Sequence, residues 1–209
     1  MAKEAAFEAY FDRYEAWFEK NIFVYQAELR AIKSFLPPDG KGLEIGVGSG
    51  LFAAPLGIRH GVEPSRSMSA KARDRGIAVT HGVAEALPFG DAVFDFALMV
   101  MTVCFLDDMD AAFSQTNRVL KPGGTFVIGF VDKNSPLGKA YEQNKRQSVF
   151  YKDATFYAVD DLLAYLTKAG FGEFSIAQTI FGMPSDIPAD EPVKPGYGEG
   201  SFVVIKAMK

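Results

Sequence analysis

A nine-residue apolar run at 93–101 (VFDFALMVM) constrains the fold of this 209-residue chain more than any other feature. A nearly continuous apolar strand is typical of the middle of a parallel sheet, where both faces are covered. Further runs of strand length occur at 42–47, 58–62, 77–81, 125–131, 174–181 and 202–207. Because helical segments separate most of these runs, the sequence predicts an α/β fold with helices on the faces of a largely parallel sheet.

Two helices are expected before the first strand. The first carries an aromatic stripe at helical spacing, made of Phe7, Tyr10, Phe11, Tyr14, Trp17 and Phe18. The second spans 24–36, with Leu29, Ile32 and Leu36 facing inward, and ends at the Pro-Pro-Asp-Gly of 37–40. The aromatic stripe either packs on the core or forms a lid that approaches a cation, since aromatic faces attract positive charge.

Helices are also expected in the later parts of the chain. A short one follows Gly50, one covers 68–75, and one is opened by the acids at 107, 108 and 110. Two more cover 135–149 and 160–169. Residues 182–200 are rich in proline and glycine, which predicts a long loop that acts as a lid or as a mobile connector.

Composition narrows the classes of function. The net charge is −4 and no block of lysine or arginine occurs, so neither nucleic acid nor an anionic membrane is an expected partner. The only cysteine, Cys104, can build neither a disulfide framework nor a cysteine zinc site, which favours a reducing cytoplasm. The charged N-terminus does not read as a signal peptide, no apolar stretch is long enough to span a membrane, and no metal site is expected.

The strongest local signal is the glycine-rich segment 44–50 (EIGVGSG), directly after the first expected strand. Glycines at the carboxyl end of such a strand let the backbone approach a ligand closely. Glu63 ends the second strand, 17 residues after Gly46, where an acid accepts hydrogen bonds from a ribose; the alternative is a solvated helix cap. Leu51 stands where a dinucleotide frame has glycine or alanine, so a mononucleoside ligand is favoured.

These residues resemble the motifs of the class I, S-adenosylmethionine-dependent methyltransferases of the type 11-like group. The matching segments are 43–50, 62–65, 82–89, 94–106, 118–124 and 160–171, in family order. The small prokaryotic members described as histamine N-methyltransferase-like are also similar. The resemblance implies a Rossmann-like, doubly wound, seven-stranded sheet in the order 3-2-1-4-5-7-6, mostly parallel with an antiparallel last strand.

The resemblance also divides the chain by role within one domain, 1–209. It implies N-terminal helices over the site in 1–36, a cofactor-binding core in 40–131, and a substrate-side segment with closing strands in 132–209. The residues implied in binding S-adenosylmethionine are Glu44, Gly46, Val47, Gly48, Gly50, Glu63, Pro64, Met68, Ala84, Glu85, Met99 and Val100. Many family members have aspartate where this chain has Val83, so Glu85 or backbone groups would recognise the adenine amino group instead.

The candidates for contact with a small-molecule methyl acceptor are aromatic: Tyr14, Trp17, Tyr25, Tyr141 and Tyr151. Methyl transfer from a sulfonium is an in-line displacement that needs alignment and exclusion of water, so no catalytic triad is required. Neither His60 nor His81 is expected to be catalytic.

Two alternatives remain at the level of sequence. A nicotinamide-dependent oxidoreductase shares the strand, turn and acid, although Leu51 and the lack of a Tyr/Lys or His/Asp catalytic pair weaken it. A non-catalytic module that binds S-adenosylmethionine is the other, because an intact binding motif does not demonstrate turnover.

Overall fold

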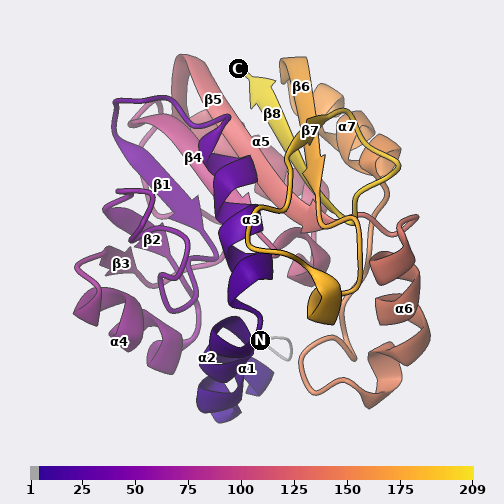
Figure 1. Ribbon diagram of the computed structural model, residues 1–209. Coiled ribbons are helices and arrows are strands. Elements are labelled where there is room, and N and C mark those ends of the chain that lie inside the picture. The colour runs from indigo at the N-terminus through magenta and orange to yellow at the C-terminus, as the bar shows by residue number, and fades with distance from the viewer. Residues whose placement is uncertain (1–4) are drawn as a thin grey trace.

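An eight-stranded sheet forms the centre of the computed structural model, which describes residues 5–209 (Figure 1). Residues 1–4 of the expected N-terminal helical segment lie outside the described residues. In sheet order β3-β2-β1-β4-β5-β8-β6-β7, the strands are Ala78–Thr80, His60–Val62, Gly42–Ile45, Phe94–Val100, Leu120–Val131, Phe202–Met208, Gly172–Thr179 and Lys194–Pro195. The first five strands in this order, β3 to β5, pair in parallel. Each of the last three, β8, β6 and β7, pairs antiparallel with the strand before it in the order.

The sheet confirms the expected α/β fold and adds one short strand. Without the two residues of β7, the strands stand in the predicted order 3-2-1-4-5-7-6. β7 lies inside the predicted 182–200 loop and pairs with β6 through Ala177 and Gln178. The Gln178 side-chain oxygen also accepts hydrogen bonds from the backbone N–H groups of Glu199 and Gly200, at 2.9 and 2.7 Å. This loop is therefore fastened along the sheet edge.

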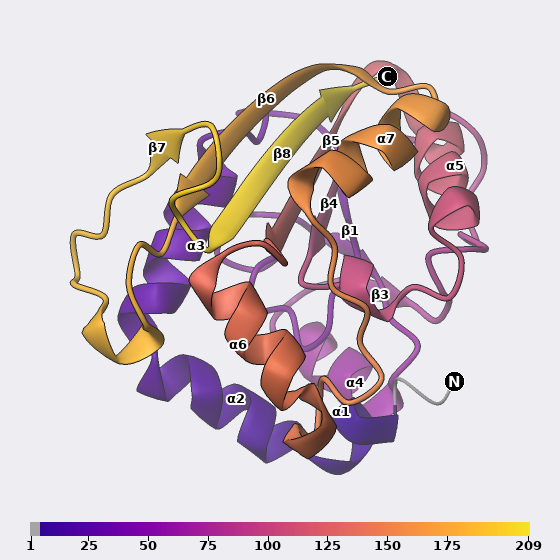
Figure 2. The same cartoon turned by 90° about the vertical axis from the view of Figure 1, so that its right-hand side faces the viewer.

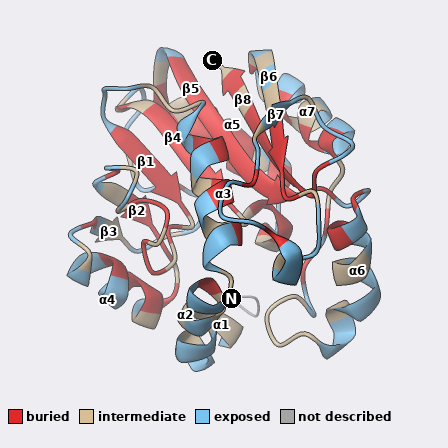
Figure 3. Cartoon of the chain, viewed as in Figure 1, coloured by how far each residue is buried: buried red, intermediate tan, exposed pale blue. Residues whose placement is uncertain are grey.

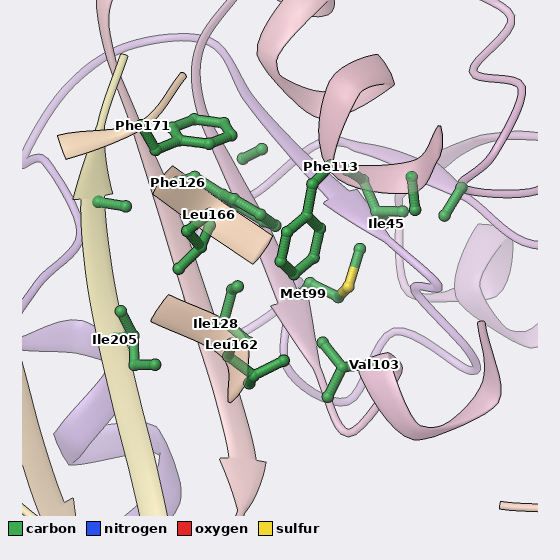
Figure 4. Packing of buried hydrophobic residues seen from close by; sticks show 14 of the residues in the cluster. Ile45, Met99, Val103, Phe113, Phe126, Ile128, Leu162, Leu166, Phe171 and Ile205 are labelled. Atoms are coloured by element: carbon green, nitrogen blue, oxygen red, sulfur yellow. The ribbon is translucent and has the colours of Figure 1, made fainter. Parts of the chain in front are cut away.

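Helices cover both faces of the sheet (Figures 1 and 2). The helices are α1 (Ala5–Ala9), α2 (Phe11–Lys20), α3 (Ile22–Lys33), α4 (Arg66–Asp74), α5 (Met109–Val119), α6 (Pro136–Asn144) and α7 (Val159–Lys168), with 3₁₀ turns at Val103–Phe105, Lys145–Gln147 and Pro184–Asp186. The side chains of α3 and α4 enter one apolar core and those of α5 and α7 the other. Because strand side chains alternate between faces, Met99 packs with Phe113 and Phe126 on the α5 side (Figure 4).

Burial follows this layered arrangement (Figure 3). The central strands are buried on both faces, and the exposed residues lie on the outer sides of the helices. Side-chain oxygens of Ser65, Asp108 and Ser135 cap α4, α5 and α6 by accepting backbone N–H groups of their first turns. Helices α1, α2 and α6 lie beyond the carboxyl ends of the parallel strands (Figures 1 and 2).

Three local predictions were wrong. The aromatic stripe does not run through one helix, because the helix is interrupted at Tyr10, which is exposed. The residues after Gly50 form turns over 51–57 rather than a helix. The prediction for the second helix is right at Ile32 but wrong in extent: the fully buried face of α3 also holds Val24, Ala27, Glu28 and Ala31. Leu29, and Leu36 beyond the end of α3, are only half-buried against the same core. The two alanines allow close packing against the sheet, which a stripe of leucines does not.

Replacing Gly50 with alanine should destabilise the fold. Gly50 has φ +84° and an added Cβ would lie 2.5 Å from Cδ1 of the buried Ile77. Gly57→Ala is the matched control, since its φ is +76° but nothing lies within 4 Å of an added Cβ. We expect Gly50→Ala to lower the free energy of unfolding by about 2–4 kcal/mol and Gly57→Ala by about 1 kcal/mol in urea titrations. Equal losses would contradict the packing role of Gly50.

Candidate functional site

A cavity of about 640 Å³ opens at the carboxyl ends of β1, β2 and β4. One side, the strand-side wall, is drawn from the segments 46–48, 62–68, 82–85 and 100–107. The opposite helix-side wall is drawn from α1, α2, α3, α6 and residues 148–151. Ligands of open α/β sheets bind at this edge, where the topology changes direction. None of residues 182–200 lines the cavity, so the structure does not support a lid there.

The glycine turn is hydrogen-bonded to the end of β2. The backbone N–H groups of Gly46 and Val47 both donate to the carbonyl of Val62, at 2.9 and 3.0 Å. The next N–H, of Gly48, donates to Oε2 of Glu63 at 2.9 Å. The N–H of Ser65 donates to Oε1 of the same carboxylate at 2.9 Å. The Glu63 carboxylate is thus fixed in the strand-side wall, where it can accept further hydrogen bonds from a ligand.

Each glycine of the turn has a different structural reason. Gly46 has φ +72° and an added Cβ would lie 2.5 Å from the Thr102 hydroxyl oxygen. Gly48 has φ +53° and faces the cavity, where an added Cβ would be 3.6 Å from the Tyr14 hydroxyl. Gly50 instead packs against Ile77 and does not line the cavity. The first two glycines therefore keep a bare backbone surface at the cavity floor.

Glu85 ties two loops of the strand-side wall together. Its Oε1 accepts the backbone N–H of Asp107 at 2.8 Å and that of Asp108 at 3.4 Å. Asp107, predicted from the sequence to help open the following helix, lines the cavity. Asp108 caps α5 by accepting the N–H of Ala111. In the sequence, these two acids differ only in their distance from Met109, the first residue of α5: Asp108 is adjacent to it and Asp107 is not.

At the end of β4 the cavity is lined by Val100, Met101 and Thr102. Met101 has φ +52°, a conformation that is uncommon outside glycine and is often found at functional sites. The predicted Met99 is fully buried in the core and does not reach the cavity (Figure 4).

Twelve of the predicted residues line the cavity. On the strand side these are Gly46, Gly48, Glu63, Pro64, Met68, Ala84, Glu85 and Val100, and on the helix side Tyr14, Trp17, Tyr141 and Tyr151. Five predicted residues do not line it: Glu44, Val47, Gly50, Met99 and Tyr25. The Tyr25 hydroxyl donates to the carbonyl of Leu51 and its ring packs on Phe18 and Phe52, so this side chain has a structural role.

The helix-side wall is aromatic. Tyr141 stacks on Tyr151 with ring centroids 5.2 Å apart, and Tyr151 stacks on Phe105 at 5.9 Å. Tyr14 meets Phe18 edge-on at 5.1 Å. Burial raises the pKa of Tyr141 to about 12, and burial likewise raises the pKa values of Tyr14 and Tyr151. These phenols are therefore neutral hydrogen-bond donors at physiological pH.

A carboxylate that sequence reasoning missed, Glu28, completes this wall. It lies on the buried face of α3, one turn after Val24, and both residues line the cavity. Glu28 is 6% exposed, and its carboxyl group forms neither a hydrogen bond nor an ion pair with any of residues 5–209. Burial alone raises its pKa from 4.5 to about 8. A shift of this size corresponds to a cost of roughly 5 kcal/mol for the ionised form.

Glu44 lies on β1 below the cavity floor. It is 1% exposed, and its Oε2 has no hydrogen-bond partner among residues 5–209. Burial raises the pKa of its carboxyl well above the usual value; the Ala53 N–H opposes this and the charge on Glu63 adds to it. The acid at the start of the glycine motif is therefore close to Glu63 but separated from the cavity itself.

Carboxylates of α1 and α2 anchor these helices to the strand-side loops. Glu15 accepts hydrogen bonds from the Ser49 hydroxyl and, at 2.5 Å, from Arg75, which also donates to the Ser49 carbonyl at 2.7 Å. Glu8 accepts the Ser65 hydroxyl at 2.6 Å and the Ser67 N–H at 3.1 Å. The N-terminal helices are thus attached to the glycine turn and to the loop after β2.

Residues 5–209 contain no group of three or more His, Cys, Asp or Glu side chains arranged to hold a metal ion. His60 and His81 are outside the cavity lining. No helix within the same residues has the length and apolar character needed to cross a membrane.

Known proteins share this fold and this motif arrangement. A family model described as a methyltransferase domain matches residues 43–128. An uncharacterized protein of Methanocaldococcus jannaschii is 42% identical over 203 residues, which is 97% of this chain and 98% of that protein. The malonyl-[acyl-carrier protein] O-methyltransferase of Geobacter sulfurreducens is 31% identical over 183 residues, covering 77% of this chain and 68% of that enzyme.

A solved structure is similar over almost the whole chain. It is a Thermotoga maritima protein described as an S-adenosylmethionine-dependent methyltransferase and possible histamine N-methyltransferase, with 51% identity, a TM-score of 0.96 and 99% coverage of both chains. The chain belongs to the S-adenosylmethionine-dependent methyltransferase family. It is an enzyme of that class with S-adenosylmethionine as cofactor, which replaces the nicotinamide and non-catalytic alternatives.

The buried acid Glu28 should make the protein less stable as the pH rises. The folded chain keeps the Glu28 proton up to pH about 8, whereas the unfolded chain releases it near 4.5, so stability falls between these values. Glutamine does not ionise. We expect the wild type to lose about 3–5 kcal/mol of unfolding free energy relative to Glu28→Gln when the pH is raised from ~5 to ~8.5.

Unfolding in urea at the two pH values measures this difference. Glu19→Gln is the matched control, because Glu19 is an exposed acid on the adjacent α2 and does not line the cavity. A difference for Glu28→Gln that is independent of pH would show that Glu28 is not held protonated by burial.

Proposed function

We propose that this enzyme transfers the methyl group of S-adenosylmethionine to a small-molecule acceptor by in-line displacement. One observation carries the proposal: the glycine turn and the Glu63 carboxylate form a single hydrogen-bonded unit in one wall of a cavity whose opposite wall is aromatic. Bound S-adenosylmethionine supplies an activated methyl group, because its sulfonium sulfur leaves as a neutral thioether.

Successive segments of the strand-side wall offer contacts suited to the methionine part, the ribose and the adenine of the cofactor. Gly46 and Gly48 offer bare backbone for the methionine part, and Glu63 offers a fixed charged acceptor for the two ribose hydroxyls. Pro64 and Met68 present apolar surface for a flat base, and Ala84 closes this end of the cavity. The carboxylate of Glu85 is already engaged by the 107–108 backbone, so recognition of the adenine edge falls to backbone groups near 83–85 and 106–107.

Transfer also needs alignment and a dry site. The aromatic rings of the helix-side wall exclude water, and the Tyr14 hydroxyl lies directly over Gly48, near the proposed position of the sulfonium. A cavity of about 640 Å³ is within the usual range for one cofactor-sized ligand and a small partner, which favours a small acceptor over a polymer.

The proposal divides the chain by role. Residues 40–131 form the cofactor-binding core, the helices within 1–36 cover the site, and 132–209 add the substrate-side segment and the closing strands. In support, the strand-side wall comes from within 46–107, and Tyr141 and Tyr151 come from the later segment.

Loss of the Glu63 charge should weaken cofactor binding selectively. Because a charge-assisted hydrogen bond contributes about 1.5–3 kcal/mol, Glu63→Gln should raise the Kd for S-adenosylhomocysteine about 10- to 100-fold in calorimetry. Asp91→Asn is the control, since Asp91 is exposed, pairs with Arg118 and does not line the cavity. Absence of S-adenosylmethionine binding to the wild type up to millimolar concentration, or an unchanged Kd for Glu63→Gln, would contradict the proposed site.

A further inference from the structure

Glu28 places a carboxylate in the cavity where the helical pattern calls for an apolar side chain. Its neighbours on the same face of α3, Val24 and Ala31, are buried and apolar. More than nine-tenths of Glu28 is buried, and none of the residues 5–209 gives its carboxyl group a hydrogen bond or a counter-ion. A buried, unpaired carboxylate is unfavourable for folding, so this one has a use that the fold alone does not explain.

The charged groups nearest this part of the cavity do not neutralise it. Arg13 and Lys20 line the cavity from α2, but both are exposed and neither forms an ion pair with Glu28. The phenols of Tyr14, Tyr141 and Tyr151 line the same cavity, whereas the Tyr25 phenol donates to the Leu51 carbonyl. Phenols can donate a hydrogen bond but carry no positive charge, so they offer Glu28 no counter-ion.

Aromatic rings complete the surroundings of Glu28. Tyr14, Trp17, Phe18, Tyr141 and Tyr151 share the wall with Glu28. Ring faces attract cations, most strongly where water is excluded. The Glu28 carboxyl keeps its proton in the empty site, but a cation beside it favours the ionised form. A carboxyl group that ionises next to a cation, together with several ring faces, is a binding arrangement for an organic ammonium ion, whereas a carboxylate or phosphate acceptor gains nothing from it.

We infer that the methyl acceptor is a small amine and that Glu28 binds its nitrogen as an ion pair and then accepts its proton. This inference rests on the proposed function, and it adds the acceptor class and a residue with a defined role. An alcohol could also donate to Glu28, but it would leave the cation-binding character of the aromatic wall unused.

The reaction balances as follows. When the ammonium R–NH₃⁺ binds, Glu28 releases its own proton to solvent and the ion pair forms. R–NH₃⁺ then passes one proton to the Glu28 carboxylate and becomes R–NH₂. The nitrogen lone pair forms the new N–C bond to the methyl group while the C–S bond breaks, and that electron pair stays on sulfur. The products are the neutral thioether and R–NH₂CH₃⁺. The product leaves as the ammonium, and Glu28 keeps the transferred proton, as in the empty site, so one proton per turnover has gone to solvent.

Binding and turnover with matched compounds test this inference. Primary and secondary aryl and alkyl amines, among them benzylamine and 2-phenylethylamine, are compared with the alcohol and the carboxylic acid of the same skeleton. Calorimetry with protein saturated with S-adenosylhomocysteine measures their binding, and formation of S-adenosylhomocysteine from S-adenosylmethionine measures turnover. We expect binding and turnover with members of the amine series and with neither of the other two series.

Variants then assign the role of Glu28. Because both an ion pair and a proton acceptor are lost, Glu28→Gln should lower kcat/KM for the best amine by about 10²- to 10⁴-fold. The Kd for S-adenosylhomocysteine should stay within about 2-fold, and Glu28→Asp should restore part of the activity. Glu19→Gln, the exposed acid on α2, should behave as the wild type.

Several results would overturn the inference while leaving the proposed function intact. These are binding of S-adenosylmethionine without binding or turnover of any amine, turnover of alcohols or acids in place of amines, and full amine turnover by Glu28→Gln. An equal loss of S-adenosylhomocysteine binding in Glu28→Gln would make Glu28 a cofactor residue instead. Failure of the wild type to bind S-adenosylmethionine would refute the proposed function itself.

Discussion

Three successive backbone N–H groups, those of Gly46, Val47 and Gly48, donate to the end of β2, and the site depends on this contact. Two of them extend the β1–β2 ladder onto the Val62 carbonyl, and the third reaches the Glu63 side chain. The turn and the carboxylate therefore cannot move independently. Parallel strands alone bring their carboxyl ends to one edge, but this contact sets where a ligand would meet bare backbone and charge together.

The parts of the fold and of the site that could be predicted are those that depend on short, local sequence patterns. The apolar runs predicted the strands within a few residues, and their alternation with helices predicted a largely parallel sheet; the strand order followed from the family resemblance. Gly46, Gly48 and Glu63 were found because a glycine turn and an acid at a strand end form a short pattern with a physical reason. Met99 was misplaced, although the alternation of side chains along β4 separates it from Val100.

Glu28 could not be predicted from the same kind of pattern. The large apolar residues Leu29, Ile32 and Leu36 were the natural choice for the inward face of 24–36. The structure buries Val24, Ala27 and Ala31 more fully than the two leucines, because the small alanines let α3 approach the sheet closely. The choice depends on the partner surface, which periodicity does not describe, and it carries Glu28 inside. The break at Tyr10 was likewise invisible, since residues 5–20 contain neither proline nor glycine.

The cavity is built from two sets of segments that lie apart in the chain. Everything proposed to hold the cofactor lies within 46–107, whereas most of the opposite wall comes from α1 to α3 and from residues 137–151. The two walls are joined by the apolar core that α3 shares with the sheet and by the polar contacts of Glu8 and Glu15. A substitution on the cavity face of α2, α3 or α6 can therefore change which acceptor fits without touching the glycine turn or the hydrogen bonds that fix Glu63.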